Sequence, residues 1–189
     1  VTENIQWIRL LYAFPAHVTD ELIEVMAREE KICKYLDVPL QHISDHLLRG
    51  MNRSITTRQS VDLIKKIRAK IPGAHIRTSF IVGLPGETEE NFQELMDFIR
   101  DMSFERVGAF VYSLEEGTPA YAMSGQVADR IKRKRMNLLM ASQQEISQSI
   151  QKRKIGRTFD VLIDEAQEGE EGIYLGRTQY DAHEVDGVV

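Results

Sequence analysis

Two short stretches carry residues that could bind a small ligand. The first, Thr78 to Glu87, reads T-S-F-I-V-G-L-P-G-E and indicates a buried strand that ends in a turn before a helix. Gly83 and Gly86 would let the backbone approach a ligand closely and aim its N–H groups outward. A phosphate loop is not expected, because no Lys follows the turn and Glu87 would oppose a phosphate. Glu87 is instead interpreted as a negative charge at a helix start. A tight turn without any ligand is the alternative.

The second stretch follows the next predicted strand towards the amino terminus. Gln41, His42 and Ser44 offer an amide, an imidazole and a hydroxyl that could hold ribose or carboxylate oxygens. Ser44 could equally be only a helix cap, and the sequence offers His42 no acid–base partner. Further on, Arg53 could bind a carboxylate or compensate a helix dipole.

A third polar group, Tyr112-Ser113 with the E-E-G-T-P run at 115–119, also follows a predicted strand. Because the carboxyl ends of parallel strands meet at one edge of a sheet, all three groups are expected on one rim. The five His residues form no H-x-x-x-H or H-E-x-x-H pair, so no metal site is predicted. The residues alone therefore indicate an α/β protein with a rim site for a small polar ligand.

Strands alternate with helices along the chain, which predicts parallel pairing and right-handed crossovers. Such a sheet could be open or could be a section of an α/β barrel. Strands are expected at 5–12, 35–40, 76–82 and 106–112. Helices are expected from Thr19 or Asp20 to 30, from Ser44, from a Thr56–Gln59 capping box to 71, from Thr88, and over 127–154. Beyond Gly156, short strands at 159–163 and 172–175 indicate a small β-module.

Composition indicates an ordinary globular protein: 189 residues, 42% hydrophobic and 28% charged. The single Cys33 excludes an internal disulfide framework and favours a reducing cytoplasm, and no apolar run is long enough for a membrane span. The net charge is −5, but residues 158–189 hold nine acidic residues against Arg177, a local net of −8. This acidic segment would suit a basic protein partner better than nucleic acid, unless it is only a solvated surface.

Three ordered motifs carry a family resemblance. They are L-D-V-P-L-Q-H-I-S-D-x-x-L-x-x-M-N-R (36–53), T-S-F-I-V-G-L-P-G-E-T-E-E-N-F (78–92) and V-G-A-F-V-Y-S-L-E-E-G-T-P-A-Y (107–121). Together they resemble the radical S-adenosylmethionine methylthiotransferases. The resemblance implies that residues 1–156 supply strands three to six of a six-stranded partial α/β barrel. It also implies that residues 157–189 begin a TRAM domain, a small β-barrel.

The family has two branches that differ in substrate. One modifies the β-carbon of an aspartate in a small-subunit ribosomal protein, and the other modifies an isopentenylated adenosine in tRNA. Gln41-His42, the E-E-G-T-P-A-Y run and G-R-T-x-x-D-A-x-E-V-D-G at 176–187 resemble the ribosomal-protein branch. The resemblance thus implies a basic ribosomal protein as partner, with tRNA as the alternative. A non-catalytic nucleotide- or partner-binding module that begins at Val1 is the alternative of another class.

The resemblance also implies cofactors. S-adenosylmethionine would have its adenine against Ile81 and Gly83 with Tyr112 on the other side, and its ribose and methionine ends near Gln41, Ser44 and Arg53. Family members hold two 4Fe-4S clusters through sets of cysteines, whereas this chain has only Cys33, interpreted as a structural thiol. The chain is therefore expected to be an inactive fragment, with no metal ligand or catalytic residue of its own.

Overall fold

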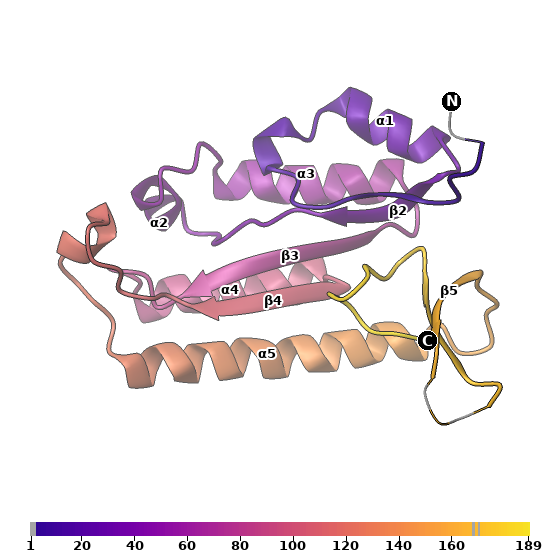
Figure 1. Ribbon diagram of the computed structural model, residues 1–189. Coiled ribbons are helices and arrows are strands. Elements are labelled where there is room, and N and C mark those ends of the chain that lie inside the picture. Colours follow the sequence, from indigo (N-terminus) through magenta and orange to yellow (C-terminus); the bar gives the residue numbers. More distant parts are fainter. Residues whose placement is uncertain (1–2, 168, 170) are drawn as a thin grey trace.

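A parallel sheet with strand order β1-β2-β3-β4 forms the centre of the computed structural model, which describes residues 3–167, 169 and 171–189 (Figure 1). The strands are β1 (Ile8–Leu10), β2 (Ile32–Asp37), β3 (His75–Val82) and β4 (Arg106–Val111). The helices are α1 (Asp20–Arg28), α2 (Asp45–Gly50), α3 (Thr57–Lys70), α4 (Glu89–Met102) and α5 (Asp129–Lys152), with 3-10 turns η1 (Pro15–His17) and η2 (Pro119–Ala122). A separate antiparallel pair joins β5 (Val161–Ala166) to β6 (Tyr174–Thr178). The predicted α/β order and the parallel pairing are confirmed.

The core lies between one face of the sheet and its helices. On β3, Phe80 is fully buried and makes edge contacts with Phe98 of α4 and with Phe104. Because successive strand residues point to opposite faces, Arg77 and Ile81 lie on the other face, where both are only half-buried. Figure 1 shows α4 behind β3 and β4, so the viewer looks onto this second face. We call it the open face.

Local helix-start signals mostly act as predicted. Thr56 and Gln59 form the expected capping box, and Thr88 forms a second box with Asn91. Thr19, rather than Asp20, caps α1 by accepting the Leu22 N–H at 3.2 Å. Local side-chain acceptors thus satisfy helix N–H groups that have no partner inside the helix.

Some strand boundaries differ from the predicted ones. β1 has three residues instead of eight, as an edge strand with an irregular register against β2. β2 begins at Ile32, so Cys33 lies inside the strand and not before it. Pro39 has no N–H for the ladder, which explains why regular pairing stops at Asp37. β5 and β6 each begin two residues later than expected.

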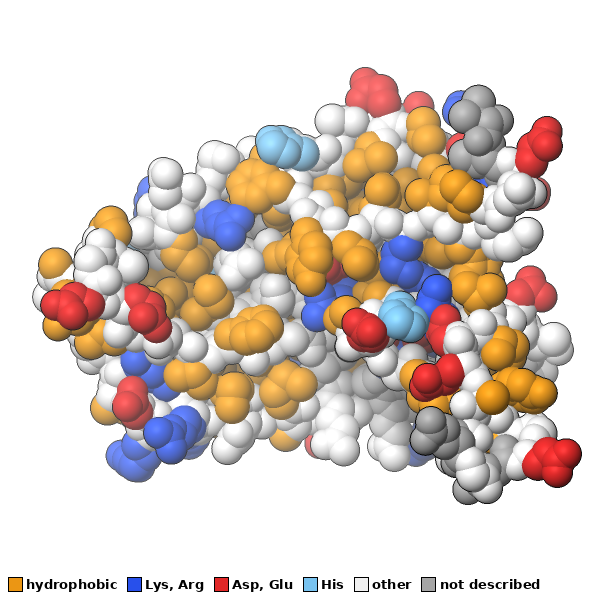
Figure 2. All heavy atoms as spheres, in the orientation of Figure 1, with side chains coloured by type: hydrophobic (Ala, Val, Ile, Leu, Met, Phe, Trp, Pro, Cys, Tyr) orange, Lys and Arg blue, Asp and Glu red, His pale blue; other side chains and the backbone are white. Residues whose placement is uncertain are grey.

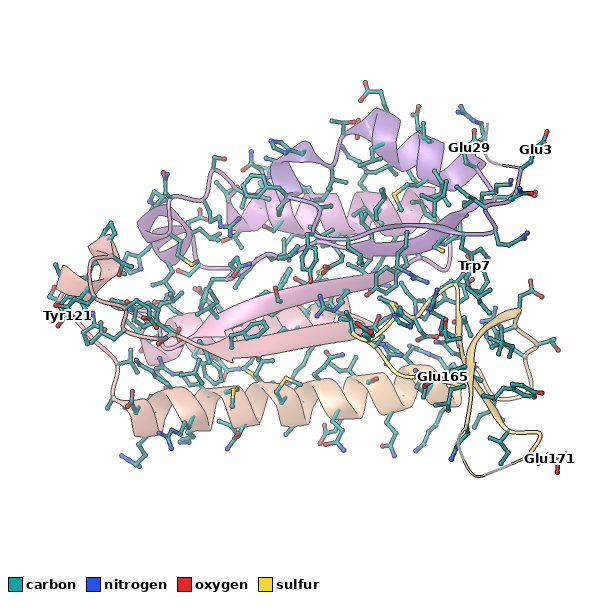
Figure 3. The ribbon with its side chains drawn as sticks, viewed as in Figure 1. Glu3, Trp7, Glu29, Tyr121, Glu165 and Glu171 are labelled. Carbon is teal, nitrogen blue, oxygen red and sulfur yellow. The ribbon has the colours of Figure 1, made fainter. Side chains whose placement is uncertain are left out.

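The residues after β6 cover the amino end of the open face. We call residues 179–187 the C-terminal segment. Asp186 accepts a hydrogen bond from the Tyr35 hydroxyl at 2.7 Å, and Asp181 pairs with Arg106 at 2.8 Å. Ala182 packs on Cys33 and Tyr35, with Trp7 alongside, and Figure 3 shows Trp7 between β2 and this segment. No local sequence pattern indicated this contact between the predicted barrel and the β-module.

These contacts change the electrostatic argument drawn from the acidic tail. Asp181 and Asp186 lie within ion-pair distance of arginines on the sheet, and Asp164 pairs with Arg177 of β6. Three of the nine acidic residues are therefore compensated within the chain. Acidic side chains still surround the C-terminal end in Figure 2. Among the described residues, no helix is long and apolar enough to cross a membrane.

Candidate functional site

The carboxyl ends of β2, β3 and β4 meet at one rim, as predicted. The Gln41 N–H donates to the Ser79 carbonyl at 2.8 Å, and the Gln41 carbonyl accepts the Ile81 N–H at 2.8 Å. On the other side of β3, the Tyr112 N–H donates to the Val82 carbonyl at 2.9 Å. Backbone hydrogen bonds therefore place Gln41, Ile81 and Tyr112 side by side, with Gly83 between the last two. Gln41 has a positive φ of 70°.

The rim has an apolar floor on the open face. Ile81 is half-buried there and pairs in register with Phe110, whose side chain is 57% exposed. Gly108 lies one pleat earlier on β4 and adds no side chain. The floor can therefore accept a flat apolar group, with polar backbone groups around it.

The neighbouring Lys132 side chain leaves room only for glycine at position 83. Gly83 has a φ of +78°, and a Cβ atom at this position would lie 2.3 Å from Cγ of Lys132. The buried Lys132 side chain crosses Gly83, donates to the Tyr112 carbonyl at 3.1 Å and lies 5.0 Å from the centre of the Tyr112 ring. Lys132 thus ties α5 to the end of β4. The Tyr112 hydroxyl oxygen is buried and has no hydrogen-bond partner among the described residues.

The position of the Glu87 carboxylate contradicts the sequence-based interpretation of the turn. This carboxylate is fully buried and turns back, where Oε2 accepts the N–H groups of Gly83 at 2.6 Å and Leu84 at 3.2 Å. It is not a charge placed at a helix start. The N–H groups of Gly83 and Leu84 therefore face Glu87 and not a ligand, so the expectation that the glycine turn aims them outward was wrong.

Arg135 of α5 neutralises Glu87 from the other side. Its Nη1 lies 2.8 Å from Oε1 of Glu87 and also donates to the Glu87 carbonyl at 3.1 Å, while Nη2 reaches Glu89 at 3.1 Å. Burial raises the pKa of Glu87, and Arg135 with the two backbone donors opposes that shift. The basic run in α5 is thus divided: Lys132 and Arg135 point inward, and Arg130, Arg133 and Lys134 are exposed.

His42 is packed next to the same carboxylate. Its Nδ1 accepts the Ser44 N–H at 3.0 Å, so the proton of the neutral ring is on Nε2, which lies 3.8 Å from Oε2 of Glu87. That distance is too long for a hydrogen bond. Burial, with the Arg135 charge nearby, lowers the pKa of His42 to about 4. Glu87 is thus the carboxylate nearest to His42, which could not be identified from the sequence. The neutral His42 ring packs beneath the rim.

Ser44 and Arg53 lie on loops around the same end of the sheet. Ser44 precedes α2, but its hydroxyl caps nothing there and instead accepts from the Asn91 side chain at 3.3 Å. The Arg53 guanidinium lies 5.2 Å from the centre of the Phe14 ring and has no ion-pair partner in the described part of the chain. No hydrogen bond between described residues joins either side chain to Gln41, Ile81 or Tyr112. The structure therefore brings together four of the six predicted residues.

The residues of this chain do not fit an iron–sulfur cluster. Cys33 is buried in the amino-terminal half of β2, at the opposite end of the sheet from the rim, and burial raises the pKa of its thiol. One thiolate cannot hold a 4Fe-4S cluster. Within residues 3–167, 169 and 171–189, no three His, Cys, Asp or Glu side chains are grouped to bind a metal ion.

Comparisons with known proteins agree with this architecture. The radical SAM superfamily model matches residues 3–99, and the TRAM domain model matches residues 155–189. The chain is 50% identical over 187 residues to ribosomal protein uS12 methylthiotransferase RimO of Desulforamulus reducens, covering 99% of this chain and 42% of that protein. It is 52% identical over 185 residues to the protein of that name from Heliobacterium modesticaldum, covering 98% and 40%. The chain thus spans about two fifths of the length of these relatives.

A solved structure shows the same fold at low identity. Coproporphyrinogen III oxidase (HemN) from Escherichia coli, described as a radical SAM enzyme, superimposes with a TM-score of 0.62 at 17% identity. The match covers 74% of this chain and 32% of that one, which supports the barrel-section architecture. Since the superfamily model also matches just over half of the residues, the chain belongs to the radical SAM superfamily.

Proposed function

We propose that this chain is part of a methylthiotransferase that modifies the small-subunit ribosomal protein uS12. The reaction would add a methylthio group to the β-carbon of an aspartate by radical S-adenosylmethionine chemistry. The observation that carries the proposal is the identity of 50% along 99% of the chain to a uS12 methylthiotransferase. The enzyme would act in the cytoplasm, and its protein partner would be basic.

The rim offers a place for S-adenosylmethionine. The adenine would lie on the apolar floor against Ile81 and Gly83, with Tyr112 on its other side. Gln41, Ser44 and Arg53 would serve the ribose and methionine ends. When bound, the cofactor supplies a 5′-deoxyadenosyl radical and a methyl group. Gly83 would contact it through Cα and the carbonyl, because its N–H is held by Glu87.

The chain's own residues would hold this rim in position. Lys132 fixes the Tyr112 carbonyl, and the buried Glu87–Arg135 pair fixes the turn after β3. Each contact joins the ends of β3 or β4 to α5. Such support holds the ligand-facing backbone in one arrangement before the ligand arrives, which lowers the cost of orienting it.

Two 4Fe-4S clusters would complete the enzyme, bound by cysteines outside these 189 residues. The chain alone would therefore be inactive. This follows from the cysteine count, since Cys33 is the only cysteine in the sequence and is buried far from the rim.

Mass spectrometry of uS12 from cells with and without the gene tests the proposal. We expect the aspartate of uS12 to carry a methylthio group in the parent strain, to lose it on deletion, and to regain it on complementation. Loss of a methylthio group from an adenosine of tRNA, with uS12 unchanged, would contradict the proposal and favour the tRNA branch. Unchanged modification of both would favour a non-catalytic module.

A further inference from the structure

A cavity at the other end of the sheet has the chemistry of a phosphate site. It has a volume of about 260 Å³ and lies where β3 begins and α5 ends, remote from the rim. Four cationic side chains line it: Arg68, Arg153, Lys154 and Arg157. The only carboxylate among its lining residues is Glu105.

Glu105 is already engaged with Arg68, and Asp181 and Glu105 offset part of the Lys154 charge at longer range, which leaves Arg153 and Arg157 without a carboxylate partner in the described part of the chain. Glu105 pairs with Arg68 at 3.0 Å and accepts the Ile76 N–H at 2.9 Å. Among the described residues, no carboxylate lies within ion-pair distance of the other three cations, Arg153, Lys154 and Arg157. A cluster of this kind attracts a multiply charged anion.

Helix-dipole compensation accounts for Arg68 but not for the other three. Arg68 donates to the carbonyls of Met102 and Ser103, where α4 ends. The side chains of Arg153, Lys154 and Arg157 donate to no helix carbonyl in the described part of the chain. Two of them lie on aromatic rings instead: Lys154 is 5.8 Å from the Tyr180 ring centre, and the Arg157 guanidinium is 5.3 Å from that of Phe159. The rings hold the cations at the cavity without neutralising them.

His75 also lines the cavity. His75 is only 8% exposed, and its ring stacks against Tyr180 with centroids 4.3 Å apart. Its Nδ1 is buried, and none of the described residues forms a hydrogen bond with it.

We propose that this cavity binds a phosphate group, held by Arg153, Lys154 and Arg157. The site is separate from the rim and does not depend on the proposed methylthiotransferase activity. Two sources supply such a group: a small free phosphate compound, or the backbone of single-stranded RNA. The shared recognition chemistry is that of the phosphoryl oxygens.

Binding by the 189-residue chain tests this site. The probes are inorganic pyrophosphate, followed by calorimetry, and a fluorescent oligouridylate, followed by anisotropy. The test variant replaces Arg153, Lys154 and Arg157 by Gln. The matched control replaces Arg130, Arg133 and Lys134 by Gln, the same charge change at the other end of the same helix. Because Lys154 is half-buried, a second variant with only Arg153→Gln and Arg157→Gln guards against misfolding, which circular dichroism would reveal.

We expect the test variant to bind at least one of the probes about tenfold more weakly or worse, and the control to stay within about twofold of the parent chain. Binding of pyrophosphate alone assigns the site to a small phosphate compound. Binding of the oligouridylate with a salt dependence that flattens in the test variant assigns it to RNA. Equal losses in test and control variants, or no binding of either probe by the parent chain, would overturn the proposal.

Discussion

Replacing Arg135 by Leu should destabilise the fold strongly, because it leaves the Glu87 carboxylate buried without its cation. The Glu87 side chain is 0% exposed and that of Arg135 only 6%, so solvent does not screen the pair. Removing one partner of such a pair costs about 3–5 kcal/mol. For a chain of this size, that loss lowers the melting temperature by about 6–20 °C. The exposed Arg133→Leu on the same helix should change stability by less than about 0.5 kcal/mol.

A double-mutant cycle with Glu87→Gln separates the ion pair from packing. The amide keeps an acceptor for the N–H groups of Gly83 and Leu84 but carries no charge. In this background, Arg135→Leu should cost about 1 kcal/mol, which gives a coupling energy of at least about 2 kcal/mol. Urea unfolding followed by circular dichroism measures all four free energies.

The pH dependence of folding stability gives an independent test of the same variant. Without Arg135, the pKa of folded Glu87 should rise further above its unfolded value. A raised folded pKa means that stability is present below the unfolded pKa and is lost as pH rises. The stability gap between Arg135→Leu and the parent chain should therefore widen from pH 5 to pH 8. If Arg135→Leu alone costs less than about 1 kcal/mol, or costs the same with Glu87 as with Gln at that position, the buried ion pair does not stabilise the fold.

Three further predictions concern the rim and the open face. Gly83→Ala should cost about 3 kcal/mol or more of stability, because its Cβ would collide with Lys132. Gly73 has the same φ of +78° but open space around it, so Gly73→Ala should cost only about 1 kcal/mol. Equal losses of the two variants in thermal melts would contradict this prediction. The pKa of His42 is lowered to about 4 from its ordinary value near 6.5, so the folded chain binds this proton less well than the unfolded chain does. Stability should therefore fall as the pH is lowered from about 6.5 to about 4, by about 3 kcal/mol at most. His42→Asn, which keeps an acceptor, should flatten that part of the urea stability–pH profile, and an unchanged slope would exclude the assignment. Tyr35→Phe removes a hydroxyl hydrogen bond of 2.7 Å to the C-terminal segment and should lower the free energy of unfolding in urea by about 1–2 kcal/mol. The absence of a measurable loss would count against stable packing of this segment on the sheet.

Local patterns predicted most of the fold. The Thr56–Gln59 capping box and the Thr88 cap were found because capping involves residues three apart in the sequence. The common rim of Gln41, Ile81 and Tyr112 was found because parallel pairing places strand ends at one edge. Both inferences use rules that depend only on neighbouring residues or on strand direction.

Long-range partners could not be predicted in the same way. Glu87 was assigned to a helix start from its position, but its partner Arg135 lies 48 residues away. Tyr35 meets Asp186 across 151 residues, so the docking of the C-terminal segment left no local signal. The requirement for glycine at position 83 could not be predicted either, because the sequence pattern does not show that the Lys132 side chain crosses it.

The position of bound S-adenosylmethionine tests whether the rim is the cofactor site. A crystal structure of the complete, cluster-loaded protein with this cofactor would show where the adenine lies. We predict adenine on the apolar floor at the carboxyl ends of β3 and β4, against Ile81 and Gly83 and facing Tyr112. Adenine bound elsewhere, without contact to these three residues, would contradict it.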